Sequence, residues 1–268
     1  MRIRVCVAGA TGWAGGPVTR HILKAQGFQL VGAVARRDAG RDIGEALGLP
    51  EAGITIAPDL DEALAAPADV LIDYTTPATV KARTLRALDR GLRVVIGTSG
   101  LAAAEFEEIE QKAVACGLGV IAAGNFSVSA ALAKHFALIA ARYMPSWEIV
   151  DYAQADKVDA PSGTAQELAE ALGQIAPSQL AMPIEKTHGR PDARGAGVAG
   201  TQVHAVRLPG YVLSFEALFG LPDERLSIRH DAGSGAEPYV GGTILAAQRV
   251  MTMTGLVRGL DTLLFGQP

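Results

Sequence analysis

Two loops of this 268-residue chain have the residue types and spacing to bind anions. The first loop, residues 9–15, reads Gly-Ala-Thr-Gly-Trp-Ala-Gly and follows the apolar run Arg2–Ala8, which predicts a strand. Its three glycines suit a tight turn, a close approach of backbone N–H groups to a pyrophosphate, and packing of a helix against a strand. The spacing predicts a dinucleotide-binding loop, with a purely structural turn as the alternative.

Two arginines, Arg36 and Arg37, follow the second expected strand, where dinucleotide-binding proteins select between cofactors. Guanidinium groups suit a 2′-phosphate, because arginine forms bidentate, charge-assisted hydrogen bonds to phosphate. The expected cofactor is therefore NADPH, with NADH possible. The alternative is a solvated turn in which Asp38 binds the ribose instead.

The second loop, residues 157–165, reads Lys-Val-Asp-Ala-Pro-Ser-Gly-Thr-Ala and precedes a helical pattern. Ser162 is a plausible helix N-cap. The N–H groups of Gly163 and Thr164 would then point out of the helix N-terminus, beside Lys157. This arrangement predicts an anion pocket suited to a carboxylate, with a well-capped structural loop as the alternative.

Strand and helix patterns alternate in the first half of the chain, which is typical of βαβ units with a parallel sheet. The expected strands are Arg2–Ala8, Gln29–Ala35, Val70–Tyr74, Arg93–Gly97 and Gly119–Ala123, and the expected helices are Gly15–Gln26, Asp61–Ala65, Ala78–Arg90 and Ala102–Ala115.

The pattern changes after Asn125 and predicts a second domain. Its expected elements are the helix Ser129–Tyr143, the strand Trp147–Ala155, the helix Gly163–Ile175, a loop over 177–200, and the strands Gln202–Leu208, Tyr211–Phe219 and Glu224–Asp231. Pro209-Gly210 is expected to turn between the first two of these three strands. The helix Val240–Met253 is expected to return to the first domain.

The fold class is therefore α/β, with a Rossmann-type parallel sheet plus an α+β domain that has a mostly antiparallel or mixed sheet. Residues 1–125 and 236–268 are expected to form the dinucleotide-binding domain, and 126–235 the substrate-binding and oligomerisation domain.

Composition excludes several classes of protein. Hydrophobic residues make up 49% and charged residues 19% of the chain, which argues against disorder. The net charge of −4 argues against a nucleic-acid or membrane-surface partner. Two cysteines, Cys6 and Cys116, and five histidines leave little material for a metal site. With no apolar run of about 18 residues and no signal-peptide pattern, a cytoplasmic protein is expected.

The chain resembles the dihydrodipicolinate reductase family over nearly its whole length. The resemblance rests on residues 9–15, 72–77, 95–100, 125–127, 157–165 and 197–201, of which the K-x-D-A-P-S-G-T-A run is the most specific. It implies an NAD(P)H-dependent reductase that transfers a hydride to an anionic cyclic imine or conjugated double bond in lysine and diaminopimelate synthesis. It also implies a homotetramer, assembled through the sheet of a second domain that closes over the cofactor.

The motifs and the resemblance together assign roles to individual residues. For the small anionic substrate, the candidate binding residues are Lys157, Gln154, Ser162, Gly163 and Thr164. The candidate cofactor-binding residues are Gly9, Thr11, Gly12, Trp13, Ala14, Gly15, Arg36, Arg37, Tyr74, Thr75, Gly97, Thr98, Ala123, Asn125 and Phe126.

One departure from the family concerns the proton donor. The family's pattern E-x-H-H-x-x-K has a histidine pair where this chain has Ala153 and Gln154. Alanine has no proton to donate, and glutamine does not titrate near neutral pH. Lys157 is therefore the candidate catalytic residue, ahead of Tyr152, Asp156 or water. The departure leaves two alternatives open: a diverged imine reductase or amino-acid dehydrogenase, and a non-catalytic nucleotide-binding relative.

Overall fold

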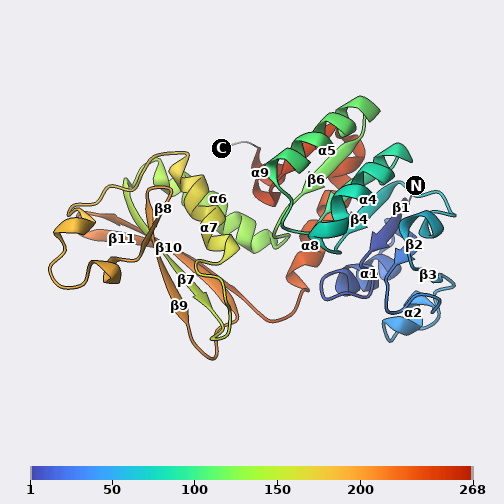
Figure 1. The fold of residues 1–268 in the computed structure, drawn as a ribbon, viewed down its shortest axis with the longest axis horizontal. Helices are drawn as coiled ribbons and strands as arrows, with labels where there is room; N and C mark the ends of the chain where they lie inside the picture. The colour runs from blue at the N-terminus through green and yellow to red at the C-terminus, as the bar shows by residue number, and fades with distance from the viewer. Residues whose placement is uncertain (1, 267–268) are drawn as a thin grey trace. The chain divides into compact units, whose positions relative to one another are not determined.

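The chain forms two compact units in a computed structural model that describes residues 2–266. Of the described residues, the first unit contains 2–128 and 235–266, and the second contains Ser129–Ser234. Figure 1 shows a strand-and-helix unit built from the blue, teal, green and red segments, and a second sheet built from the yellow-green to orange segments.

The first unit is built on a seven-stranded sheet with the order β12-β6-β5-β4-β1-β2-β3, in which every pair of neighbours is parallel. This is the Rossmann-type sheet expected from the alternating pattern. Its strands are β1 (Ile3–Ala8), β2 (Phe28–Val34), β3 (Ile56–Ala57), β4 (Val70–Asp73), β5 (Arg93–Ile96), β6 (Gly119–Ala122) and β12 (Gly255–Arg258).

Helices pack on this sheet, with α4 against α5 and α1 against α8 (Figure 1). The helices of the unit are α1 (Gly15–Lys24), α2 (Ile43–Ala46), α3 (Leu60–Ala63), α4 (Pro77–Asp89), α5 (Ala103–Cys116), α8 (Pro238–Arg249) and α9 (Leu260–Phe265). Every residue of β4 and β6 is buried, because strands covered on both faces have no solvent side. This explains their continuous apolar runs.

Several short elements have no counterpart in the expected pattern. They are α2, β3, β12 and α9, none of which is longer than six residues. The expected helix Val240–Met253 is wrong at its end, because α8 stops at Arg249 and a 3₁₀ turn over Val250–Thr252 leads to β12. Such short segments carry too few residues to show a hydrophobic period, and β12 depends on pairing with the distant β6.

The second unit contains a mixed five-stranded sheet with the order β11-β10-β7-β9-β8. Its strands are β7 (Ser146–Ala153), β8 (Ala196–Val198), β9 (Thr201–Arg207), β10 (Leu213–Leu221) and β11 (Glu224–Ala232). β7 pairs parallel with β9 and antiparallel with β10. The expected turn at Pro209-Gly210 therefore does not form a hairpin: β9 and β10 lie on opposite sides of β7, which uses both of its edges.

The loop expected over 177–200 also contains structure. It holds β8, which pairs antiparallel with β9, and two 3₁₀ turns at Ile184–Lys186 and Pro191–Arg194. The proline and glycine content of this segment predicts a loop. The three-residue strand β8 could not be predicted, because pairing with β9 stabilises it.

One face of this sheet is covered by α6 (Val128–Ala141) and α7 (Gly163–Gly173). Burial alternates along β7, so that Trp147, Ile149, Asp151 and Ala153 share the covered face. Asp151 is the one charged residue of these four, which places a carboxylate among apolar side chains. Among residues 2–266, no helix has the length and apolar character that a membrane span requires.

Candidate active site

Three loops of the first unit meet where the strand order reverses, because β1 lies between β2 and β4. The N–H groups of Gly9 and Ala10 donate to the carbonyl of Val34 at 2.9 and 3.1 Å, and the N–H of Tyr74 donates to that of Ala8 at 2.9 Å. Ligands of open α/β sheets bind outside the carboxyl ends of the strands at such a reversal. The glycine loop therefore lies where a dinucleotide would bind.

The glycine loop is a close-packed turn that leaves backbone donors free. Gly9 has φ of +80°, and a Cβ there would meet the carbonyl of Tyr74, while a Cβ on Gly15 would meet the carbonyl of Gly9. Among residues 2–266, the N–H groups of Thr11 and Ala14 donate to no protein acceptor. These donors at the N-terminus of α1 fit an anion such as a pyrophosphate.

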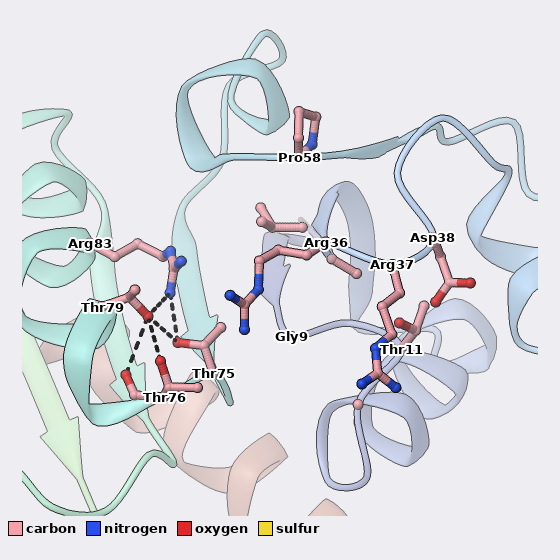
Figure 2. A pocket seen from close by; sticks show the side chains of 13 residues that line it. Gly9, Thr11, Arg36, Arg37, Asp38, Pro58, Thr75, Thr76, Thr79 and Arg83 are labelled. Carbon is pink, nitrogen blue, oxygen red and sulfur yellow. Dashed lines mark hydrogen bonds between the residues drawn. The ribbon is translucent and has the colours of Figure 1, made fainter.

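A cavity of about 490 Å³ opens beside this loop (Figure 2). Its lining consists of Gly9, Thr11, Gly12, Val34, Ala35, Arg36, Arg37, Asp38, Pro58, Thr75, Thr76, Thr79 and Arg83. Figure 2 shows the guanidinium of Arg36 reaching into the cavity and that of Arg37 lying near Thr11. Neither guanidinium has a hydrogen-bonding partner among the described residues, whereas Asp38 accepts a hydrogen bond from Arg41 at 3.1 Å.

Arg83 is a third guanidinium at this cavity, and the sequence analysis missed it. It extends from α4 and donates to Oδ2 of Asp73 at 3.0 Å. It also donates to Oγ1 of Thr75 at 2.6 Å (Figure 2). Oδ1 of the buried Asp73 also accepts a hydrogen bond from the N–H of Thr75 at 2.9 Å. The spacing of Thr76, Thr79 and Arg83 at three and four residues, which puts them on one helix face, was the available signal.

Tyr74 and Phe126 support the site from within the core. The ring of Tyr74 packs on Gly97, its hydroxyl lies 2.6 Å from Oγ1 of Thr243, and burial raises its pKa. Phe126 is 1% exposed and meets Tyr74 edge to face, with ring centroids 6.2 Å apart. The side chains of these two predicted cofactor residues therefore fix the loops at this edge of the sheet.

The other predicted cofactor residues lie at the same edge of the sheet. Thr98 Oγ1 accepts a hydrogen bond from the N–H of Thr75 at 2.9 Å, and Asn125 Oδ1 accepts one from Ser127 at 2.8 Å. Ala123 is buried and donates its N–H to Ile96 at 3.1 Å. Trp13 is 62% exposed, with its ring edge-on to Tyr239.

The second unit carries the lysine loop. Ser162 caps α7 as predicted, because its Oγ accepts a hydrogen bond from the N–H of Ala165 at 3.3 Å. Among residues 2–266, the N–H groups of Gly163 and Thr164 donate to no protein acceptor, and both face out of the helix N-terminus. Ser162 itself is 2% exposed and bonded to Asp151, so its side chain holds the loop rather than facing a ligand.

Lys157 is a partly exposed cation at the start of the same loop. Its ammonium lies 2.6 Å from Oδ1 of Asp159, and this hydrogen bond lowers the pKa of Asp159. The loop therefore combines a cation, two free amides and a helix N-terminus, a combination that can bind a carboxylate.

The two positions that lack histidine differ in exposure. Ala153 is 0% exposed at the end of β7, between Leu213 and Arg207, whereas Gln154 is exposed and donates its N–H to Val212 at 3.3 Å. Neither side chain can serve as an acid near neutral pH.

Other side chains of the second unit could donate a proton, but most of them already have a hydrogen-bonding partner. The hydroxyl of Tyr152 donates to Glu216 at 3.1 Å, and burial together with that carboxylate raises the pKa of Tyr152. His204 lies 2.7 Å from Glu148, and His230 lies 3.1 Å from Ser129. His188 is exposed between the two 3₁₀ turns.

The parallel sheet, the glycine loop and the arginine-lined cavity define a protein of the dinucleotide-dependent oxidoreductase class. Residues 3–126 match the family described as dihydrodipicolinate reductase, N-terminus, and residues 127–264 match the one described as dihydrodipicolinate reductase, C-terminus. The chain therefore belongs to the dihydrodipicolinate reductase family, whose members use a pyridine nucleotide.

Individual relatives match over almost the whole chain. The 4-hydroxy-tetrahydrodipicolinate reductase of Moorella thermoacetica is 41% identical over 269 residues, covering 98% of each chain. That of Bacillus pumilus is 36% identical over 270 residues, again covering 98% of each. The solved structure of dipicolinate-bound dihydrodipicolinate reductase from Paenisporosarcina sp. TG-14 covers 98% of this chain and 100% of its own, with 30% identity and a TM-score of 0.87.

A more distant structure shares only the fold. The amine dehydrogenase of Mycobacterium smegmatis has 16% identity and a TM-score of 0.66, and it covers 97% of this chain and 96% of its own.

Proposed function

We propose that this protein is an NADPH-dependent 4-hydroxy-tetrahydrodipicolinate reductase of lysine and diaminopimelate synthesis. The observation that carries the proposal is the lysine loop, which holds the ammonium of Lys157 and leads into the free amides of Gly163 and Thr164 at the N-terminus of α7. A carboxylate is the substrate group that this combination binds best. The relatives in Moorella and Bacillus carry the name of this activity.

The first unit binds the cofactor in this proposal. The free amides of Thr11 and Ala14 would hold the pyrophosphate, and Arg36 and Arg37 the 2′-phosphate. The preference for NADPH over NADH is supported by two guanidinium groups without protein partners and by the engagement of Asp38 with Arg41. When bound, the nicotinamide supplies a hydride to the double bond of the substrate.

The second unit binds the substrate and supplies the proton. Gly163, Thr164 and Lys157 hold a substrate carboxylate, and the exposed amide of Gln154 offers a further hydrogen bond. Lys157 donates the proton from Nζ, with Asp159 holding that ammonium in place at 2.6 Å. A general acid contributes about 10²–10⁴-fold to the rate.

We also propose a cytoplasmic homotetramer that assembles through the sheet of the second unit. The face of this sheet opposite α6 and α7 carries the partly exposed apolar side chains of Val150, Val206 and Leu218 beside Tyr152. The residues paired with these side chains across the strands include Glu148, Glu216 and His204, so the face mixes apolar and charged groups, as subunit interfaces also do.

The test is oxidation of NADPH, followed by its absorbance, with the freshly generated product of dihydrodipicolinate synthase. A panel of cyclic imines and oxo acids is assayed in parallel. The proposal expects turnover of the synthase product. Turnover of another compound without turnover of this product would overturn it, and NADPH binding without any turnover would favour a non-catalytic relative.

A second candidate, a diverged imine reductase or amino-acid dehydrogenase, is favoured by one observation. Ala153 and Gln154 remove the charge and the acid that a histidine pair would bring to the site, which suits a smaller or less acidic substrate. The same substrate panel separates the two candidates.

A further inference from the structure

Asp151 is a carboxylate with 0% exposure on the helix-covered face of β7. Its neighbours on that face, Ile149 and Ala153, are apolar and equally buried. A buried charge is costly unless other groups pair with it and hydrogen-bond to it. The partners of Asp151 therefore show what this position does.

Both carboxylate oxygens of Asp151 hold Ser162. Oδ2 accepts a hydrogen bond from the N–H of Ser162 at 2.7 Å, and Oδ1 accepts one from its hydroxyl at 2.6 Å. Because Ser162 caps α7 through Ala165, the carboxylate anchors the start of that helix to the end of β7.

Arg207, at the end of β9, completes the arrangement. Its Nη2 donates to Oδ2 of Asp151 at 2.7 Å and to the carbonyl of Asp159 at 2.7 Å. Its Nη1 donates to the carbonyls of Asp151 and Val206 at 3.1 and 3.0 Å. Arg207 therefore fixes the first residue of the segment 159–162, and Asp151 fixes the last.

We propose that Asp151 and Arg207 are positioning residues that set the geometry of the substrate's carboxylate site. This inference rests on the proposed function. Arg207 holds the backbone of Asp159, whose carboxylate in turn holds the ammonium of Lys157. Asp151 holds Ser162, which orients the free amides of Gly163 and Thr164. The pair thereby brings a cation and two N–H donors to one carboxylate.

The ion pair between Asp151 and Arg207 also neutralises the negative charge near the N-terminus of α7. An unpaired carboxylate beside the N-terminus of α7 would repel a bound anion and offset the positive potential of that helix end. Because Arg207 neutralises Asp151, the positive potential of the helix N-terminus remains available to the substrate.

The first test compares Michaelis constants. Asp151→Asn removes the charge, and Arg207→Lys keeps a charge but loses the fork that reaches two acceptors at once. For Asp151→Asn we expect the KM for substrate to rise at least ~10-fold, the effect of one charged hydrogen bond, with a smaller rise for Arg207→Lys. The KM for NADPH should stay unchanged, because no residue of the cofactor cavity belongs to this pair.

Glu148→Gln is the matched control on the same strand. Glu148 lies on the opposite face of β7 and pairs with Arg194 at 2.9 Å and His204 at 2.7 Å. Glu148 itself makes no hydrogen bond or ion pair with residues 159–162, so its loss disturbs the same sheet while the KM for substrate should not change. Equal rises in KM for Glu148→Gln and Asp151→Asn would overturn the positioning role.

Hydrogen–deuterium exchange of residues 157–164 in the free protein gives a readout that needs no substrate. We expect faster exchange there in Asp151→Asn and Arg207→Lys, and wild-type exchange in Glu148→Gln. Wild-type exchange in the first two variants would overturn the inference. If the wild-type protein fails to reduce the synthase product, the proposed function fails, while exchange still decides the positioning role. If Asp151→Asn does not fold, Arg207→Lys, which keeps the charge balance, carries the test.

Discussion

The guanidinium of Arg83 lies 3.0 Å from the carboxylate of Asp73, a side chain with 0% exposure, at the cavity that Arg36 also lines. This ion pair ties α4 to the end of β4. Because Asp73 also accepts the N–H and the hydroxyl of Thr75, the pair fixes the loop that borders the cavity.

Arg83→Gln should destabilise the protein strongly. It leaves Asp73 as a buried charge without a cation, for which the free energy of unfolding should fall by about 3–5 kcal/mol. Chemical denaturation measures this change. Arg86→Gln, which breaks an exposed pair with Asp61, should cost less than about 1 kcal/mol. Asp73→Asn combined with Arg83→Gln should recover part of the loss, and equal effects of the two single arginine variants would contradict the prediction.

Replacing Arg36 and Arg37 by glutamine should weaken NADPH far more than NADH. Each lost charge-assisted hydrogen bond to the 2′-phosphate is worth about 1.5–3 kcal/mol, or roughly 10–100-fold in KM. Steady-state kinetics with both cofactors tests this, with the exposed Arg249→Gln as control. Equal losses for the two cofactors would show that the pair does not contact the 2′-phosphate.

Lys157→Ala should lower kcat by at least ~100-fold, the contribution of a general acid. Lys157→Arg should keep a KM for substrate near the wild-type value, because it retains the positive charge, yet its kcat should stay low, since a guanidinium does not release its proton. Lys134→Ala, which removes a partly buried lysine that pairs with Glu167, is the control. An unchanged kcat in Lys157→Ala would exclude this lysine as the donor.

Acid should destabilise the protein partly through His230. Burial lowers its pKa below the ordinary value of 6.5, so the unfolded chain binds more protons between the folded-state pKa and about 6.5. This contribution to stability is complete above about pH 6.5 and is lost as the pH falls toward the folded-state pKa. His230→Gln should flatten that part of the profile of unfolding free energy against pH, and a profile that keeps its wild-type slope there would contradict the prediction.

Introducing histidine at position 153 and at position 154 should change the free energy of unfolding by different amounts. Ala153→His inserts a ring where no surface is exposed, and overpacking should cost about 1–3 kcal/mol. Gln154 is exposed, so Gln154→His should change the free energy of unfolding by less than about 0.5 kcal/mol. Thermal denaturation of both variants checks this, and a fully stable Ala153→His would show that β7 has room for the ring.

Long elements and local motifs could be predicted from the sequence. The parallel sheet, the glycine loop and the Ser162 cap depend on hydrophobic period and on backbone geometry within a few residues, which the chain carries locally. The sequence could not predict that β9 pairs with β7 and not with β10, because strand neighbours depend on pairing between distant segments.

In the candidate site, too, some residues could be predicted from the sequence and others could not. The residues Arg36, Lys157 and Gly163 stand in motifs that their neighbours in sequence reveal. Arg83 and Arg207 stand in no motif, and Asp151 stands at the acidic position of the family pattern, where the sequence does not reveal its partners. The roles of all three arise from contacts across 10 to 56 positions of the chain. The sequence by itself determined which groups can bind anions. Only the tertiary structure decided which buried charges hold those groups in place, because a buried charge is stable only where folding brings its partner to it.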